Sequence, residues 1–169
     1  MDYFAHGFWS FIFFNKKKPI WAAIAFGVLP DTLSWFLFMI YNLIFNSADL
    51  GKPALSKLPS WMISLYGVTH SLIVFLIVAG IIYLIFKKIP WYVYAWPIHI
   101  LMDIPTHSRE FLPTPFLWPI SNWFFPGFSW GQPWFMILNW GLIIIFIAYV
   151  IGKRLRAKSF GKKKQTTLD

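Results

Sequence analysis

Imidazole and carboxylate side chains gather in one short stretch of this otherwise apolar sequence. His99 and Asp103 lie four residues apart, and His107 and Arg109 follow within six residues of Asp103. On a helix, residues four apart project from the same face, so His99 and Asp103 could bind one ion or hydrogen-bond to each other. Pro105 should end this helix and leave His107 and Arg109 in the following loop. The stretch predicts half of a metal site, with a buried His–Asp pair as the alternative.

Three more ionisable residues interrupt apolar segments elsewhere: His6, Asp31 and His70. A charge at membrane depth is costly unless it is paired, hydrated or bound to an ion. Counting helical residues from the nearest basic cluster at about 1.5 Å each puts His6, Asp31, His70, His99 and Asp103 in one layer about 15 to 25 Å away. We therefore expect them to meet as metal ligands, and histidine and carboxylate together suit zinc or manganese. Taken singly, each has a structural alternative, such as a helix cap or an interhelical hydrogen bond.

The elements that must position these residues are expected to be membrane helices. The 169 residues are 58% hydrophobic, 22% aromatic and 12% charged, with a mean hydropathy of +0.59. Three apolar runs are long enough to cross a bilayer and two are shorter. The long runs are 20–45, 61–86 and 134–151, and the short ones are 3–14 and 91–104. The predicted fold is an all-α integral membrane protein with about four to five transmembrane or half-membrane helices.

The chain divides into one multi-span membrane domain, residues 1–152, and a basic tail, residues 153–169. Residues 105–133 hold six prolines together with Trp118, Trp123 and Trp130. So aromatic and broken a stretch predicts an interfacial loop that caps the membrane surface. The apolar run near the N-terminus has neither a basic region before it nor a small-residue cleavage site after it, so we expect no removable signal peptide.

Basic residues fall in three clusters that should mark the cytoplasmic side. Of 15 Lys and Arg residues, 12 lie at 16–18, 87–88 and 153–164. The positive-inside rule then predicts a multi-pass protein of the cytoplasmic (inner) membrane, with a cytoplasmic C-terminal tail and the polar site in the outer half of the bilayer. The tail suits anionic lipid headgroups, whereas nucleic acid is not an expected partner. Cysteine is absent, so thiolate metal ligands are excluded.

The chain resembles the bacterial and archaeal membrane-bound metal-dependent hydrolases, which are small multi-span proteins. The matching features are a histidine in the first helix, a Pro-Asp pair, a Thr-His-Ser motif, an H-x3-D motif and a later Leu-Trp-Pro stretch. Here they are His6, Leu29-Pro30-Asp31, Thr69-His70-Ser71, His99 to Asp103, and Phe116-Leu117-Trp118-Pro119-Ile120. They occur in the family's order over about the first three-quarters of the chain.

The order of Asp31, His70, His99 and Asp103 is also similar, more distantly, to the zinc ligands of zinc-dependent phospholipases C and single-strand nucleases. That similarity implies one zinc ion held by these four residues, and a second ion bridged by Asp103 and approached by His6. The chain departs from the family at two places. Leu33 stands where a second aspartate is usual, and Leu65-Tyr66-Gly67 stands where His-Arg-Gly is frequent.

The resulting hypothesis is a hydrolase that uses a metal-activated water on an ester or phosphoester of a lipid or lipid-linked substrate. Asp31 or Asp103 could take the proton of the water, His107 could act as general acid or as a further ligand, and Arg109 could hold an anionic group. One alternative is a divalent-cation transporter, because intramembrane carboxylates and histidines also mark ion pathways. The other is a non-catalytic membrane scaffold in which the same residues form a structural polar network.

Overall fold

The computed structural model describes residues 1–45, 53 and 55–166, with side chains placed up to residue 157 except at residue 56. This part of the chain is helical and holds no strand beyond one isolated bridge between Ser108 and Gly127. The helices are α1 (Tyr3–Phe14), α2 (Ile20–Asp31), α3 (Leu37–Phe45), α4 (Ser60–Thr69), α5 (Leu72–Phe86), α6 (Ala95–Thr106) and α7 (Pro133–Thr166). A π-helical turn, Thr32–Phe36, joins α2 to α3, and 3₁₀ turns cover Leu55–Lys57 and Trp91–Tyr94. The all-α prediction is confirmed.

Among the described residues, two helices, or three if one bent pair counts as a single span, could cross a membrane. That is fewer than the four to five transmembrane or half-membrane helices that we expected. The continuous stretch Ile20–Phe45 and the first part of α7, Pro133–Ala157, are long and apolar enough, with mean hydropathies of 1.7 and 2.3. The pair α4 and α5 would be a third span only if its two halves, bent by 60°, count as one. The helices α1 and α6 have 12 residues each, which is about 18 Å and too short for a hydrocarbon layer of about 30 Å. Hydropathy indicated that the segments forming α1 and α6 are short, but it could not show the bend between α4 and α5.

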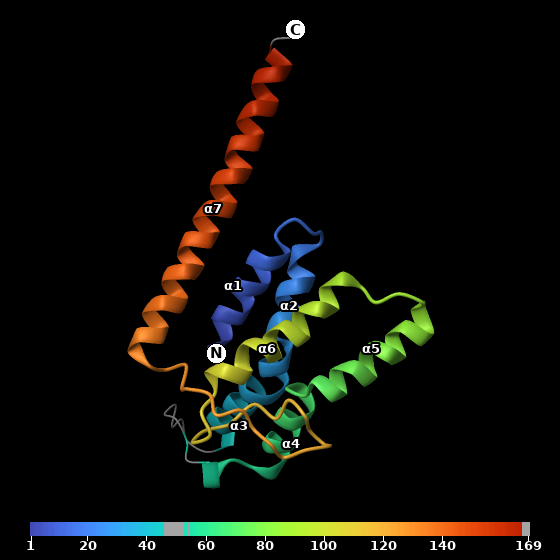
Figure 1. Cartoon of the computed structure of the whole chain (residues 1–169), viewed down its shortest axis with the longest axis vertical. Helices are drawn as coiled ribbons and strands as arrows, with labels where there is room; N and C mark the ends of the chain where they lie inside the picture. The colour runs from blue at the N-terminus through green and yellow to red at the C-terminus, as the bar shows by residue number, and fades with distance from the viewer. Residues whose placement is uncertain (46–52, 54, 167–169) are drawn as a thin grey trace.

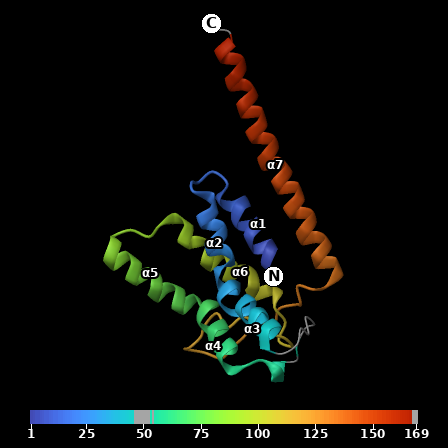
Figure 2. The same ribbon diagram turned by 180° about the vertical axis from the view of Figure 1, so that it is seen from behind.

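The helices surround a central point rather than forming parallel rods (Figure 1). The antiparallel pair α1 and α2 lies between α7 and α6. Helix α5 lies on the side of the molecule opposite α7, and the view from behind shows the same arrangement (Figure 2). Helix α7 packs on α1 through Ile143, which is buried with Ala5 and Ile12. It continues without a break through the predicted tail boundary at residue 153.

Small residues let α1 and α2 approach each other closely. A Cβ atom placed on Gly27 would lie 1.9 Å from Oγ of Ser10, so only glycine fits at this crossing. Such close backbone approach is characteristic of helix pairs in membranes, where packing replaces the hydrophobic effect. The crossing brings the end of α2 to the level of His6 on α1.

The proline-rich loop between α6 and α7 folds back under the helices. Its backbone N–H groups at Phe128 and Trp130 donate to the carbonyls of Pro105 and Thr106, at 3.0 and 2.9 Å. These bonds satisfy carbonyls that the end of a helix leaves without a partner. We expected Pro105 to end this helix, but α6 runs one residue further, to Thr106. The loop covers the C-terminal end of α6.

Candidate metal centre

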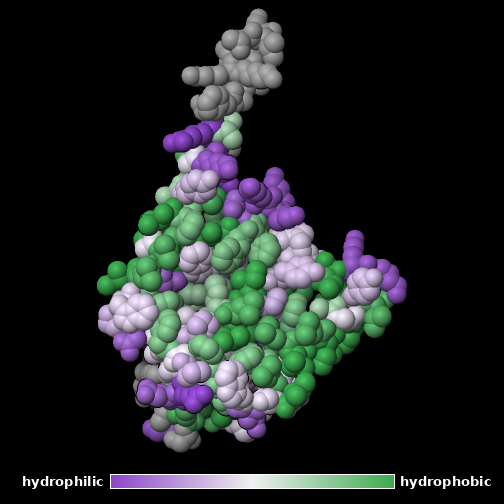
Figure 3. Space-filling model, viewed as in Figure 1, coloured by the Kyte–Doolittle hydropathy of each residue, from purple (hydrophilic) through white to green (hydrophobic). Residues whose placement is uncertain are grey.

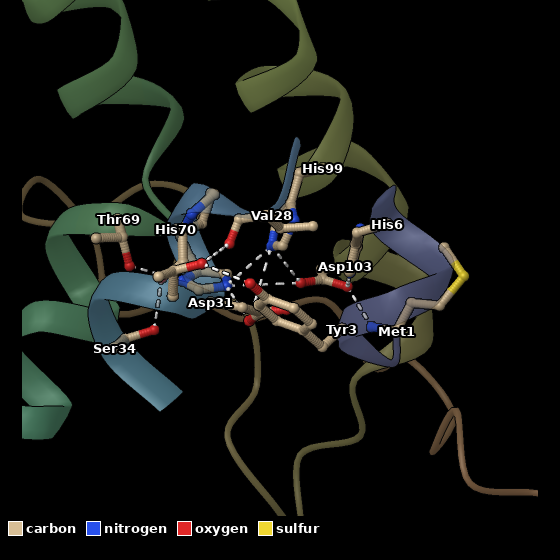
Figure 4. A network of polar contacts seen from close by, with 12 residues as sticks. Met1, Tyr3, His6, Val28, Asp31, Ser34, Thr69, His70, His99 and Asp103 are labelled. Carbon is tan, nitrogen blue, oxygen red and sulfur yellow. Dashed lines mark hydrogen bonds and ion pairs between the residues drawn. The ribbon is translucent and has the colours of Figure 1, made fainter. Parts of the chain in front are cut away.

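Four of the predicted ligands meet in the centre of the described structure (Figure 4). One carboxylate oxygen each of Asp31 and Asp103, and one ring nitrogen each of His70 and His99, all lie within 4.8 Å of one another. The side chains of His70, His99 and Asp103 are fully buried, whereas that of Asp31 is 13% exposed. The cluster could therefore hold a metal ion, with Asp31 on its accessible side.

Asp31 is placed by the irregular end of α2. It follows Pro30, and the wider π-helical turn begins at the next residue. Hydroxyl groups of Thr32 and Ser34 donate to the carbonyls of Val28 and Pro30, both at 2.8 Å. The turn keeps the backbone bonded where proline has no N–H to offer, and π-helical turns of this kind are frequent at functional sites.

His70 is placed by the break between α4 and α5. Its backbone N–H still donates to the carbonyl of Tyr66, at 2.9 Å, and its backbone then leaves helical geometry. Ser71 next caps α5, because its hydroxyl accepts from the N–H groups of Ile73 and Val74 at 3.1 and 3.2 Å. The Thr-His-Ser motif thus ends one helix, exposes the imidazole to the centre and starts the next helix.

The hydrogen bonds around the two buried imidazoles determine which nitrogen of each carries a proton. The Nδ1 atom of His99 lies 2.7 Å from the carbonyl of Gly27, which can only accept, so Nδ1 holds the proton. The hydroxyl of Thr69 donates to the carbonyl of Leu65 at 2.9 Å. Its oxygen is therefore free to accept from Nδ1 of His70, which is also 2.9 Å away. In the neutral state both rings then turn an unprotonated Nε2 into the cluster.

These two unprotonated nitrogens face each other at 3.2 Å. Two lone pairs at that distance repel each other unless a cation lies between them or one ring takes up a second proton. In addition, Oδ2 of Asp103 is buried and has no hydrogen-bond partner in the described part of the chain, although Nε2 of His99 is only 3.1 Å away. The donor atoms are thus arranged to face a common point rather than to bond each other.

The spacing of the four atoms also fits an ion. Ligands about 2.0 to 2.1 Å from a tetrahedral zinc ion lie about 3.3 to 3.4 Å from each other. The Nε2 atom of His70 is 3.3 Å from Oδ1 of Asp31 and 3.6 Å from Oδ2 of Asp103. The Nε2 atom of His99 is 3.9 and 3.1 Å from the same two oxygens. The donor set and its spacing therefore fit a divalent metal, without identifying which one.

His6, the fifth predicted ligand, lies beside this group of four. Its Nε2 is 2.9 Å from Oδ1 of Asp103, the oxygen that faces away from the other three ligands, and its ring stacks on His99 with centroids 3.6 Å apart. The amino group of Met1 pairs with the same oxygen, and Nδ1 of His107 lies 3.5 Å from it. One oxygen of Asp103 thus faces the group of four ligands, and the other faces His6, Met1 and His107. A carboxylate that bridges two ions has the same arrangement.

The remaining predicted catalytic residues differ in position. His107 adjoins the cluster, but burial and the nearby amino terminus lower the pKa of its imidazole to about 3. A ring that is neutral at pH 7 suits the ligand alternative for His107 better than the general-acid alternative. Arg109 is not brought into the cluster: its guanidinium donates to the carbonyl of Phe124, 3.0 Å away, on the exposed loop.

Sequence reasoning missed the residues that hold the ligands. Gly27 is the clearest case, because its carbonyl fixes His99 and a backbone group gives no side-chain signal in the sequence. Tyr66 stacks on His70 with ring centroids 4.0 Å apart, and its position four residues before His70 was the signal that could have found it. Tyr3 was likewise unassigned, although its hydroxyl lies 3.0 Å from Oγ1 of Thr32, next to Asp31.

Comparison with known proteins adds nothing to this description, since no protein-family model, curated protein or solved structure matches the chain. The family resemblance therefore stays a prediction that rests on the motifs.

Proposed function

We propose that this protein is a membrane-embedded, metal-dependent hydrolase that cleaves an ester or phosphoester of a lipid or lipid-linked substrate. The observation that carries the proposal is the pair of buried imidazole nitrogens 3.2 Å apart, both unprotonated when the rings are neutral, with two carboxylates at ligand spacing. The motif order of the membrane-bound metal-dependent hydrolases supports the same reading.

Asp31, His70, His99 and Asp103 would hold the ion. When bound there, a divalent metal such as zinc or manganese would act as a Lewis acid that makes water more acidic and polarises a carbonyl or phosphoryl oxygen. Residues of the protein must then accept the proton of the water and hold the ligands in position.

Asp31 is the member of the cluster that water and substrate can reach, because its side chain is 13% exposed while the other three are fully buried. A carboxylate oxygen of Asp31 is therefore the base that accepts the proton of the attacking water. Gly27 and Thr69 hold the two imidazoles in the tautomers described above. The loop after α6 donates hydrogen bonds to the carbonyls of Pro105 and Thr106. It therefore limits the access of bulk water to the cluster from the C-terminal end of α6.

The substrate class follows from the surroundings. The outer surface of α5 and α7 is apolar, with Leu84 67% and Ile137 77% exposed, and hydrophobic residues cover most of the face seen in Figure 3. A site among such helices is reached from within a lipid layer. The basic cluster on α7 meets the turn between α1 and α2, where Arg154 donates to the carbonyl of Asn15 at 2.5 Å. This supports a multi-pass orientation in the inner membrane with both basic clusters on the cytoplasmic side.

The test is hydrolysis by detergent-purified protein of phosphatidic acid and of a phosphodiester lipid in mixed micelles, with and without added zinc or manganese. We expect product release that a chelator stops, that Asp31→Asn and His70→Ala abolish, and that Asp2→Asn leaves intact. Asp2 is a matched control because its carboxylate caps α1, accepting from the N–H of Ala5 at 2.9 Å, and asparagine caps equally well. Product release that is insensitive to both the chelator and the two cluster variants would contradict the proposal.

The structural-network alternative makes the opposite prediction about metal. In that reading one imidazole carries a second proton and pairs with Asp103, so Asp103→Asn would lower stability while metal content stays at zero. A transporter would instead carry the ion across vesicles without product release. The same purified variants separate the three readings.

A further inference from the structure

An apolar groove runs between α1, α2 and α7, outside the metal centre. It has a volume of about 470 Å³, within the range of about 300 to 1,000 Å³ that is usual for small-molecule sites. Its walls include Tyr3 and Phe11 of α1, Ile24 and Val28 of α2, and Ile151 of α7. None of the four clustered ligands lines it, so the metal site does not account for it.

The groove leads from the depth of the membrane to the basic clusters. From Tyr3 to Phe11 it follows α1 for about 12 Å, at about 1.5 Å per residue, and the α1–α2 turn with Lys16 follows Phe11. On α7 it reaches Ile151, two residues before Lys153. One leaflet contributes about 15 Å of hydrocarbon, half of a layer of about 30 Å. The groove therefore extends through most of the leaflet that faces the basic clusters.

Arg154 lies at the basic end of the groove. Its guanidinium carbon is 5.4 Å from the centre of the Phe11 ring, which is part of the wall, and one N–H group donates to the carbonyl of Asn15. It follows Ile151 by three residues, so both side chains lie on one face of α7. Figure 3 shows hydrophilic residues gathered at this level, where the exposed lysines 16–18 come nearest to α7.

The positive charges at this end have no acidic partner in the surrounding helices. No aspartate or glutamate occurs at positions 3–30 or 111–168, which hold α1, most of α2 and all of α7. Within the described residues, the ion pairs of the carboxylates are with histidines and the amino terminus, and none is with a lysine or arginine. An apolar groove that ends at unpaired positive charges is complementary to a molecule with a hydrocarbon chain and an anionic head.

We propose that this groove binds an anionic phospholipid of the leaflet that faces the basic clusters, with an acyl chain in the groove and the phosphate beside Arg154. With these clusters on the cytoplasmic side, as proposed above, it is the inner leaflet. A lipid of the opposite leaflet does not fit, because its head would have to lie near Tyr3, at the deep end. The acyl chain gains little by leaving other lipid for an equally apolar groove, so the charges supply the preference for an anionic head. The bound lipid would fill the space between α7 and the α1–α2 pair.

The test is photo-labelling of the whole protein in phosphatidylcholine nanodiscs. Phosphatidylglycerol and phosphatidylcholine probes with the same diazirine-bearing acyl chain are compared as minor components, and labelled peptides are mapped by mass spectrometry. We expect the anionic probe to label residues 3–11, 24–28 and 147–151 at least about fivefold more than the zwitterionic probe. A diazirine near the end of the chain should label the Tyr3 end of the groove, and one near the glycerol should label the Phe11 end. The reverse order, or equal labelling by the two probes, would overturn the inference.

Two charge variants separate this site from general attraction to the basic tail. Arg154→Gln removes the charge at the groove but keeps an N–H donor for the carbonyl of Asn15. Its matched control is Arg156→Gln, which removes the same charge two residues later, about 200° around α7. Labelling of the groove by the anionic probe should be about fivefold lower in Arg154→Gln than in Arg156→Gln, which corresponds to about 1 kcal/mol for one basic residue. Equal labelling in the two variants would contradict the proposal.

A third variant narrows the groove itself. Ile151 is 47% exposed, so Ile151→Trp has room outside the core, and it should lower the groove labels of both probes. The control is Ile145→Trp on the same helix, because Ile145 is 63% exposed and is not part of the groove wall. It should label like the wild type. Unchanged labelling in Ile151→Trp, or no groove labelling by either probe, as expected if a second copy of the chain filled the groove, would overturn the inference. Labelling needs no metal and no turnover, so the result is independent of the hydrolase proposal.

Discussion

Replacing Thr69 with valine should weaken metal binding without disturbing the fold. The hydroxyl of Thr69 donates its one proton to the carbonyl of Leu65, so its oxygen must accept from Nδ1 of His70. Valine has nearly the same shape but cannot accept, and the buried Nδ1–H of His70 then loses its partner. The ring can move its proton to Nε2, the atom that faces the cluster, and such a ring is no longer a ligand.

The size of the effect follows from this one contact. Leaving a buried donor without a partner costs about 1 to 3 kcal/mol, and loss of a bond that orients a ligating histidine weakens metal affinity by about 10- to 100-fold. Tenfold corresponds to about 1.4 kcal/mol, so the two estimates agree. The assay is competition between the purified protein and a chromogenic chelator for zinc.

Thr106→Val is the matched control for this measurement. Thr106 is 5% exposed, as is Thr69, and its hydroxyl donates to the carbonyl of Met102, four residues earlier, at 2.9 Å. Among the residues that the structure describes, no histidine nitrogen hydrogen-bonds to this hydroxyl, so valine there should leave metal affinity within about threefold of wild type. Equal affinity in wild type and Thr69→Val, or an equal loss in both threonine variants, would refute the reasoning.

Other substitutions test the supports of the site. Gly27→Ala should lower the unfolding free energy by about 1 to 3 kcal/mol or more, because the new Cβ would overlap Oγ of Ser10. Adding Ser10→Gly to this variant should restore part of the lost thermal midpoint in detergent. Gly80→Ala, in open space, should not lower the midpoint. Ser71→Ala should cost about 0.5 to 2 kcal/mol because α5 loses its cap, and its main effect should be faster amide hydrogen exchange in the first turn of that helix. An unchanged midpoint in Gly27→Ala, or unchanged exchange in Ser71→Ala, would contradict these assignments.

Much of the helical layout could be predicted because apolar runs and their interruptions are local features of the sequence. Residues 20–45 form one continuous helical stretch, as their apolar run indicated, and residues 3–14 form α1. The polar interruption at Thr69-His70-Ser71 was visible, but the 60° bend that it produces was not. That bend depends on where Ser71 caps α5 and on the loop beneath, since Leu72 donates to the carbonyl of Phe116 at 2.9 Å.

The candidate ligands could be predicted because ionisable residues are scarce in this sequence and each one at membrane depth needs a partner. His99 and Asp103 share a helix face by their spacing alone. The carbonyl of Gly27 carries no side-chain signal, so its bond to His99 could not be anticipated. Arg109 was predicted from charge alone, and its position depends on a loop whose path the sequence pattern does not determine.

The most direct measurement is the metal content of detergent-purified protein by elemental mass spectrometry, with His70→Ala, Asp103→Asn and the control Asp2→Asn beside the wild type. We predict about one or two zinc or manganese ions per chain in the wild type and in Asp2→Asn, because both proteins keep every candidate ligand. Both cluster variants should lose them. A wild-type protein that stays metal-free after reconstitution with zinc and manganese, or equal metal in all four proteins, would contradict the account and favour a structural polar network.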